Sequence, residues 1–315
     1  MQPNDIQQTH LDISIARLSS YRSMFSGAND FELYGAYCWN EALSATLFRL
    51  IAITEVVMRN RFHEALSRHL YNQNSVGYRD SNDWYNHVDL PHKSMQKIKN
   101  ETHYRHRRSR QLLPKVPAPT ANDVVSRMTF GFWPKLLEGS MPWGQLLDHV
   151  LPGHRNANSG YWQVLARRDA LYARLDMLNK IRNRVAHFEP VWKQGDLYEE
   201  RRRRQGSPAL SVEFQKPTTP EDAIERIKLI HDRTVELLKW LSPSRCRDYK
   251  ESYVEKHFNW MCSVDGLNAY MQFKPRVILP LSRFKRDLNG LIRREQMVTV
   301  IRRQDQVGTY YPIRR

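Results

Sequence analysis

Hydrophobic residues recur at the spacing of an α-helix along most of the chain. Ile13, Leu18, Tyr21 and Phe25 predict a first helix, and Asn29-Asp30 offers an N-cap for a second. Because prolines are absent from residues 31–71, this stretch predicts one very long helix, or two helices joined at a kink. We expect it to form the spine of the fold. Its buried stripe, with a period of about 3.6 residues, consists of Leu43, Leu47, Leu50, Ile51, Thr54, Val57 and Met58.

The second half of the chain shows the same helical pattern. A helix is predicted from about Tyr161 to His187, and it should end before Pro190 because the residue preceding a proline disfavours the helical conformation. Two further helices are predicted over residues 222–240 and 247–260. Residues 72–95 and 195–220 are polar stretches typical of loops, the first with a half-buried Trp84. A short helix capped by Thr120 precedes a set of aromatic residues that either braces the core or stacks on unpaired bases: Phe130, Phe132, Trp133 and Trp143.

The tail differs from the rest of the chain. From residue 274 to 315 it mixes β-branched and basic residues, as in Met297-Val298-Thr299-Val300-Ile301-Arg302-Arg303. This pattern favours short strands. The sequence therefore predicts a mainly α fold, a helical bundle with long helices, plus a small basic C-terminal appendage with some β structure. We place the domains at residues 1–262 and 263–315.

Charge narrows the choice of partner. Lys and Arg number 49 against 33 Asp and Glu, a formal net charge of +16, which favours a polyanion such as RNA. The basic residues concentrate in residues 97–115, 201–204 and 274–315, where they could contact an RNA backbone. The candidate RNA-binding residues in the first two stretches are Arg105, Arg107, Arg108, Arg201, Arg202 and Arg203.

Other classes of function find little support in the sequence. The longest strongly apolar stretch, residues 50–58, contains Glu55 and is shorter than the roughly 20 residues of a membrane span. No signal-peptide pattern is present at the N-terminus, and the three cysteines are widely spaced, so we expect a cytoplasmic protein with free thiols. His103 and His106 lie three residues apart on what could be a helix, without the cysteines or carboxylates of a zinc site. We expect neither a metal nor a cofactor.

One motif carries candidate chemistry. Residues 181–188, Ile-Arg-Asn-Arg-Val-Ala-His-Phe, place Arg182, a polar Asn183 and His187 at the end of a predicted helix. The pattern of Arg, four residues and His is weak by itself, because Arg226 and His231 match it too, although a polar residue does not follow that arginine. Surrounding motifs distinguish the two.

Those motifs resemble the Abi-like abortive infection proteins of bacteria, the AbiD and AbiF group, over roughly residues 12–245. They comprise, in order, Arg17-Leu18, Leu33-Tyr34, Trp39-Asn40, Glu55 with Arg59-Asn60, Phe130-Gly131-Phe132-Trp133, Trp143-Gly144, and Arg182-Asn183-Arg184-Val185-Ala186-His187. Their order is far more specific than any one motif. The chain after about residue 265 lies outside the resemblance.

The resemblance implies an all-helical HEPN fold and a homodimer in which two copies of the motif form a metal-independent endoribonuclease site. His187 would be the general acid or base, Arg182 would hold the phosphate, and Asn183 would complete the catalytic set. Glu55, Arg59 and Asn60 would brace the motif helix, and Arg184 would contact RNA. Such an enzyme would act as a toxin in anti-phage abortive infection, with an antitoxin as partner, a small structured RNA being one form. A non-catalytic RNA-binding regulator on the same scaffold is the alternative.

Helix geometry adds a constraint of its own. On a regular helix, residues 182 and 187 are about 140° apart, so they do not share a face. Arg182 falls in the apolar stripe of its helix and needs a partner or an interface, because an unpaired buried charge is costly. Glu55 is the candidate partner, with Arg59 competing for it. Either the helix unwinds before His187, or one cleft collects Arg182 and His187 from two protomers.

Overall fold

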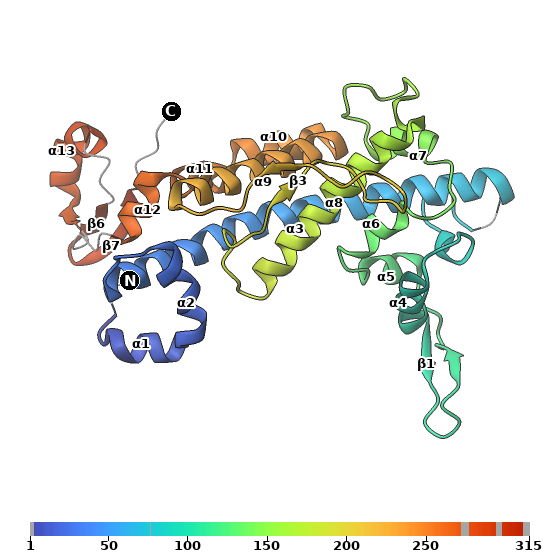
Figure 1. Ribbon diagram of the computed structural model, residues 1–315, viewed down its shortest axis with the longest axis horizontal. Helices are drawn as coiled ribbons and strands as arrows, with labels where there is room; N and C mark the ends of the chain where they lie inside the picture. Colours follow the sequence, from blue (N-terminus) through green and yellow to red (C-terminus); the bar gives the residue numbers. More distant parts are fainter. Residues whose placement is uncertain (1–2, 76, 272–276, 294–297, 311–315) are drawn as a thin grey trace.

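The computed structural model describes residues 3–75, 77–271, 277–293 and 298–310. This part of the chain is mainly helical, with small sheets at three places, and most of its helices lie along one long central helix (Figure 1). The predicted fold class, a helical bundle with long helices and a small β-containing appendage, is confirmed at this level.

The central helix is α3 (Asp30–Asn74), and it is unbroken over 45 residues, about 68 Å at 1.5 Å per residue. It begins at the predicted cap: the Asn29 side chain accepts the backbone N–H groups of Phe31 and Glu32, and the Glu32 carboxylate accepts the N–H of Asn29. Before it come α1 (Ile6–Ile13) and α2 (Ile15–Met24). Of the two readings left open for residues 31–71, a single helix is correct.

The second half of the chain packs along α3. Its helices are α7 (Trp143–Val150), α8 (Leu165–Ala186), α9 (Pro220–Leu241), α10 (Pro243–Glu251), α11 (Tyr253–Met261) and α12 (Val264–Met271). The crossing of α12 over α3 is so close that a Cβ on Gly35 would lie 2.2 Å from the carbonyl oxygen of Tyr270. The single helix predicted over 247–260 is wrong, because the chain breaks at Ser252, whose hydroxyl caps α11.

Between α3 and α7 the chain forms η1 (Trp84–Asn86), α4 (His92–Thr102), the strands β1 (His103–Arg105) and β2 (Leu112–Pro114), α5 (Ala121–Ser126) and α6 (Phe132–Leu136). The aromatic set named above is core: Phe130, Phe132, Trp133 and Trp143 are at most 2% exposed and cannot stack on bases. Trp84 is fully buried rather than half-buried, because its indole N–H donates to His63 Nδ1 at 2.8 Å. A short turn, η2 (Tyr161–Gln163), leads into α8.

The connection from α8 to α9, residues 190–219, includes two short antiparallel strands, β3 (Leu197–Tyr198) and β4 (Val212–Phe214). We refer to it below as the connecting segment. It runs along α8 and α9 (Figure 1). Arg226 on α9 holds its two arms together by donating to the carbonyl oxygens of Gly195, Phe214 and Gln215.

The C-terminal appendage is a three-stranded sheet with one helix. Strand β5 (Val277–Pro280) pairs in parallel with β6 (Val298–Arg302), which pairs antiparallel with β7 (Asp305–Tyr310). Helix α13 (Leu281–Arg293), which the sequence analysis missed, follows β5. Leu279, Leu291, Val298 and Val300 form a small core separate from the main one. The division at residue 262 stays a prediction; Leu267 on α12, beyond that boundary, lies in the main core.

Candidate functional site

The motif helix α8 ends in a Schellman turn that fixes His187. The His187 N–H still donates to the Asn183 carbonyl at 2.9 Å, so the helix does not unwind before this residue. The N–H groups of Phe188 and Glu189 then bond back to the carbonyls of Val185 and Arg184, at 3.0 and 2.9 Å. His187 is the C-cap residue, and its side chain is exposed.

Two long-range hydrogen bonds hold the chain just after His187. The Arg17 guanidinium on α2 donates to the Phe188 carbonyl at 2.6 Å, and the buried Asn40 side chain on α3 accepts the N–H of Val191 at 2.9 Å. Phe188 itself has a φ of +55°, a left-handed conformation that glycine adopts more readily. Three segments that carry the family resemblance, at residues 17, 40 and 182–187, therefore meet at one place.

Arg182 lies beside the predicted partner. One oxygen of Glu55 is 3.9 Å from Arg182 Nε, and the other is 3.5 Å from Arg59 Nη2, so the carboxylate is shared by two guanidiniums. Glu55 is 13% exposed and Arg182 31%. The pairing with Glu55 is thus confirmed, and so is the competition from Arg59. Asn60 is exposed, and among the described residues it makes no hydrogen bond to this group.

Arg182 and His187 open onto different sides of α8, as the helix geometry predicts. Arg182 lines a mainly apolar depression of about 430 Å³ between α3 and α8, which also has the half-exposed Phe48 and the exposed Phe188 in its wall. Asn183, Arg184 and His187 line a groove of about 760 Å³ between α8 and the connecting segment. One copy of the chain therefore presents the two motif residues in two separate cavities.

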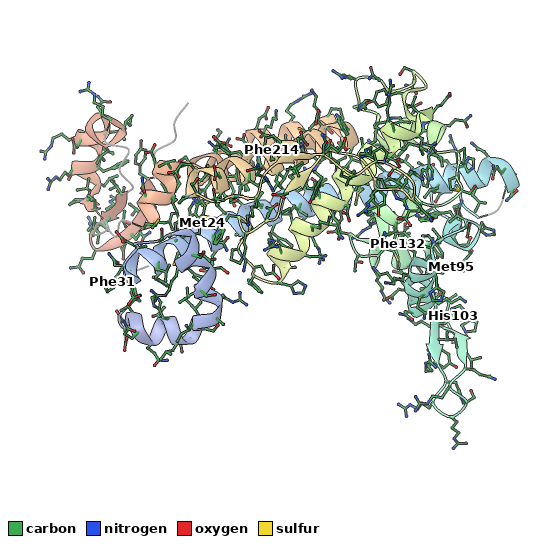
Figure 2. All side chains as sticks on the ribbon, in the orientation of Figure 1. Met24, Phe31, Met95, His103, Phe132 and Phe214 are labelled. Atoms are coloured by element: carbon green, nitrogen blue, oxygen red, sulfur yellow. The ribbon has the colours of Figure 1, made fainter. Side chains whose placement is uncertain are left out.

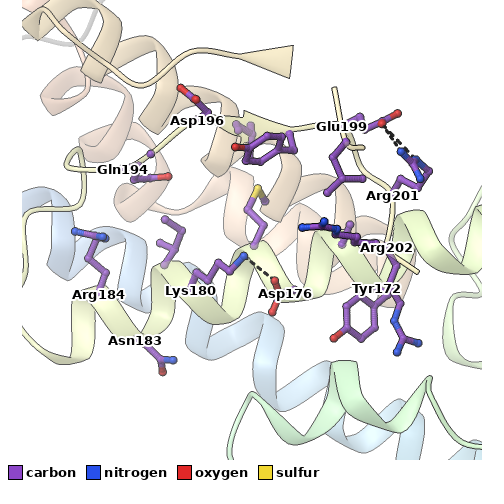
Figure 3. A pocket seen from close by; sticks show the side chains of 18 of the residues that line it. Tyr172, Asp176, Lys180, Asn183, Arg184, Gln194, Asp196, Glu199, Arg201 and Arg202 are labelled. Atoms are coloured by element: carbon purple, nitrogen blue, oxygen red, sulfur yellow. Dashed lines mark hydrogen bonds and ion pairs between the residues drawn. The ribbon is translucent and has the colours of Figure 1, made fainter. Parts of the chain in front are cut away.

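The groove has mixed charge, and most of its acidic groups are already paired (Figure 3). Lys180 contacts Asp176 at 2.8 Å on the same helix, and Arg184 contacts Glu189 at 3.1 Å. The Arg202 guanidinium lies over the Tyr172 ring, 4.7 Å from its centre. A ligand in the groove would therefore meet the paired cations Lys180 and Arg184 along α8 and the exposed imidazole of His187.

The arginines of residues 201–204 are largely used to hold the connecting segment. Arg201 pairs with Glu199, Arg202 with Glu138 and Arg204 with Asp169. Arg203 is exposed and lines the groove, and no carboxylate of the described ranges pairs with it. The assignment of Arg201, Arg202 and Arg203 to RNA stays a prediction, although two of the three already have an acidic partner.

A buried ion-pair network anchors the same segment. Arg174 on α8 is 8% exposed and binds both oxygens of Glu200, at 2.7 and 2.9 Å, as well as Glu236. Its guanidinium also lies over the ring of Trp240. These contacts tie residue 200 of the connecting segment to α8 and α9. The sequence pattern gave no sign of them, because the partners come from distant parts of the chain.

The second match to the motif has a structural role. Arg226 binds carbonyl oxygens of the connecting segment, as described above. His231 is buried, stacks on Phe258 with ring centres 4.0 Å apart, and shares a hydrogen bond of 2.9 Å with the Tyr249 hydroxyl. Burial lowers the pKa of His231. The pair favoured by the surrounding motifs, Arg182 and His187, is therefore the accessible one, whereas Arg226 and His231 are buried.

Arg105, Arg107 and Arg108 lie elsewhere, on the hairpin formed by β1 and β2 (Figure 1). His103 and His106 belong to this hairpin too, so the helix considered for them is wrong; α4 ends at Thr102. Within the described ranges, no group of three or more His, Cys, Asp or Glu side chains could hold a metal ion. Nor does any helix of these ranges have the length and apolar character needed to cross a membrane.

Comparison with known families gives one match. The model of the family described as Abi-like protein matches residues 11–193, more than half of the chain, from the end of α1 to the start of the connecting segment. The match ends at residue 193, well before residue 245, the C-terminal limit of the motif resemblance. Searches of curated proteins and of solved structures return no match. Arg17, Asn40, Glu55, Arg182 and His187 all lie inside the matched region, and the chain belongs to the Abi-like protein family, which connects it with abortive infection.

Proposed function

We propose that this protein is a metal-independent endoribonuclease of the HEPN type, and that it acts as a toxin in anti-phage abortive infection. One observation carries the proposal. Of the two histidines that match the motif, His231 is buried and His187 is exposed, and the backbone at His187 is held by a Schellman turn and by the hydrogen bond from Arg17 to the Phe188 carbonyl. An accessible imidazole on a fixed backbone is the kind of group that acid–base catalysis near neutral pH uses.

The chemistry follows from the nature of RNA. The 2′-hydroxyl attacks the neighbouring phosphorus, loses its proton, and displaces the 5′-oxygen of the next nucleotide, which takes up a proton. His187 would move one of these protons, and Arg182 would stabilise the charge that gathers on the phosphate oxygens. Asn183, which lines the same groove as His187, would orient the strand. The products would be a 2′,3′-cyclic phosphate and a 5′-hydroxyl.

The separate cavities of Arg182 and His187 support a site built from two copies. The depression that contains Arg182 is bordered by Phe48, 47% exposed, and Phe188, 74% exposed, which are apolar side chains suited to an interface. In a twofold dimer across this surface, each α8 end would face the other, so that Arg182 of one copy would meet His187 of its partner. Glu55 would position Arg182 and leave one face of its guanidinium for the phosphate.

A matched pair of variants tests the enzyme. The purified protein should cleave RNA in the presence of EDTA and leave 2′,3′-cyclic phosphate ends, and His187→Ala should abolish cleavage. His149→Ala is the control, because His149 is also an exposed histidine in the last turn of a helix, α7, and should retain activity. Full activity in His187→Ala would remove this residue from the mechanism.

The alternative function, a non-catalytic RNA-binding regulator on the same scaffold, predicts different results from the enzyme. RNA that binds but is never cut, with Arg182→Ala weakening the binding, would replace the enzyme by a non-catalytic RNA-binding protein. For the enzyme, we also propose an antitoxin partner, a small structured RNA among the candidates, since a growth-arresting nuclease must be restrained. Sequencing of RNA bound to His187→Ala, beside fragments produced by the wild type, would identify both substrate and partner.

A further inference from the structure

The hairpin of β1 and β2 projects from the helical body beyond α4 (Figure 1). Its strands pair in register from His103 opposite Pro114 to Arg105 opposite Leu112, and the N–H of Lys115 extends the pairing by donating to the Thr102 carbonyl at 2.9 Å. Below it, α4 packs into the core through Ile98, and Glu101 pairs with Arg127. The hairpin is thus an ordered arm, distant from the end of α8 in the view of Figure 1.

The turn of this arm concentrates unpaired positive charge. Arg105, Arg107, Arg108 and Arg110 are all exposed, and no carboxylate in the described ranges lies within ion-pair distance of any of them. Figure 2 shows side chains that end in nitrogen extending into solvent beyond His103. The nearest acidic residue along the chain, Glu101, is occupied by Arg127.

The unpaired arginines of the arm contrast with a second arginine cluster in the same chain. The arginines of residues 201–204 are similar in sequence, yet three of the four pair with carboxylates of this chain. Arg107, Arg108 and Arg110 on the turn and Arg105 at the end of β1 repel one another, and the one hydrogen bond that their guanidiniums make within the described residues is from Arg105 to the Arg110 carbonyl at 3.1 Å. They are the arrangement expected of a surface that binds a polyanion.

The side chains of the arm indicate the form of that polyanion. Proteins that bind single strands stack the bases on aromatic rings, but the described arm has one exposed aromatic ring, Tyr104 on β1, and none on the turn. Arginine forks bind phosphates along a helical backbone without reading bases. His106 and Ser109, which contact each other at 3.1 Å in the turn, add polar groups that can bond to 2′-hydroxyls.

We propose that the β1–β2 hairpin is a docking arm for double-helical RNA, which it binds through the phosphate backbone and apart from the α8 site. The choice of RNA over DNA rests on the proposed ribonuclease function; the contact with a double helix rests on the arm itself. The arm then binds stems without sequence preference, while cleavage takes place where a strand reaches His187.

The test uses the full-length chain with His187→Ala in the background, so that binding is measured without cleavage. Arg107→Gln with Arg108→Gln removes two charges at the apex, where neither side chain makes a hydrogen bond within the described residues. The matched control is Arg247→Gln with Lys250→Gln, two exposed cations of α10 that have no acidic partner within those residues. The probes are a 20-base-pair RNA duplex of arbitrary sequence, its separated strands and the same duplex in DNA.

For the arm variant we expect the plot of log affinity against log salt to lose about 2 units of slope, and duplex affinity at 0.1 M salt to fall by up to about 60-fold. The control should keep both values close to those of the starting protein. Equal losses in the two variants, or unchanged binding in the arm variant, would overturn the proposal. So would tighter binding of single strands or of DNA than of the RNA duplex.

Duplex binding by the arm and cleavage at the α8 site can be tested separately. Cleavage assays with the arm variant in the wild-type background report on the α8 chemistry. A chain that cleaves RNA normally but binds duplexes equally with and without Arg107 and Arg108 refutes the arm and keeps the enzyme. A chain that binds duplexes through the arm and never cleaves keeps the arm and refutes the enzyme.

Discussion

Glu55→Gln is the most direct perturbation of the charge arrangement behind the motif. The substitution keeps the shape of the side chain and removes the negative charge that faces Arg182 at 3.9 Å and Arg59 at 3.5 Å. At an effective dielectric constant of about 20, each of these contacts corresponds to roughly 4 kcal/mol of Coulomb attraction before the cost of desolvation. Because the three side chains are only partly exposed, we expect a net loss of about 2–3 kcal/mol in the free energy of unfolding.

The same helix contains a matched control. Glu64 also lies between two arginines, Arg61 at 3.8 Å and Arg68 at 2.6 Å, but it is 36% exposed. Because solvent screens exposed ion pairs, Glu64→Gln should cost less than about 1 kcal/mol.

Urea unfolding of both variants, followed by tryptophan fluorescence, measures the difference. A Glu55→Gln protein no less stable than Glu64→Gln would show that Glu55 does not hold Arg182. Activity should fall as well in Glu55→Gln, because a freed guanidinium would no longer be fixed for the phosphate.

Three further predictions follow from single features. Phe188→Gly should raise the free energy of unfolding by about 1 kcal/mol, because φ of +55° suits glycine and the ring is 74% exposed; destabilisation in urea would contradict this reading. Burial raises the pKa of the Cys262 thiol to about 12, so at pH 8 this residue should react with a thiol reagent far more slowly in the folded than in the unfolded chain; rapid native labelling would contradict its burial. Burial also lowers the pKa of His63, His154 and His231 below 6.5, so the unfolded chain binds protons first as the pH falls. Stability should therefore be full above pH 6.5 and decline below it, and urea titrations that show a gain between pH 6.5 and 5 would refute this.

The helices could be predicted where local chemistry determines them. The cap at Asn29 and the absence of proline set the start and the continuity of α3, and both lie within a few residues of sequence. The break at Ser252 was missed because apolar residues continue on both sides of it. Helix α13 was missed although Leu281, Phe284, Leu288 and Leu291 have helical spacing, because the β-branched runs on both sides dominate the pattern of the tail.

The candidate site was predictable only in part. Glu55 could be named as partner for Arg182 because a cation in an apolar stripe needs a carboxylate, and few were available. The contact between Arg17 and the Phe188 carbonyl joins residues 171 apart, and that between Asn40 and Val191 joins residues 151 apart. The pattern of neighbouring residues in the sequence cannot predict contacts over such separations. The only signal was that Arg17 and Asn40 belong to motifs of the family resemblance.

The two arginine clusters show why charge alone is ambiguous. In the sequence, residues 105–110 and 201–204 are equally basic. Only the fold shows that Arg202 meets Glu138 and Arg204 meets Asp169, carboxylates far away in the sequence, whereas the hairpin arginines meet none within the described residues. Pairing in three dimensions, which the sequence does not contain, separates cations that hold the fold from cations left for a partner.

Mixing two inactive variants tests the composite site most directly. Arg182→Ala and His187→Ala should each be inactive alone, but in a mixed dimer one site keeps an intact Arg182 from one copy and an intact His187 from the other. After subunit exchange in equal amounts, half of the dimers are mixed and each has one working site, so cleavage should return to about a quarter of the wild-type rate. A mixture that stays as inactive as its components would contradict a site shared between two chains.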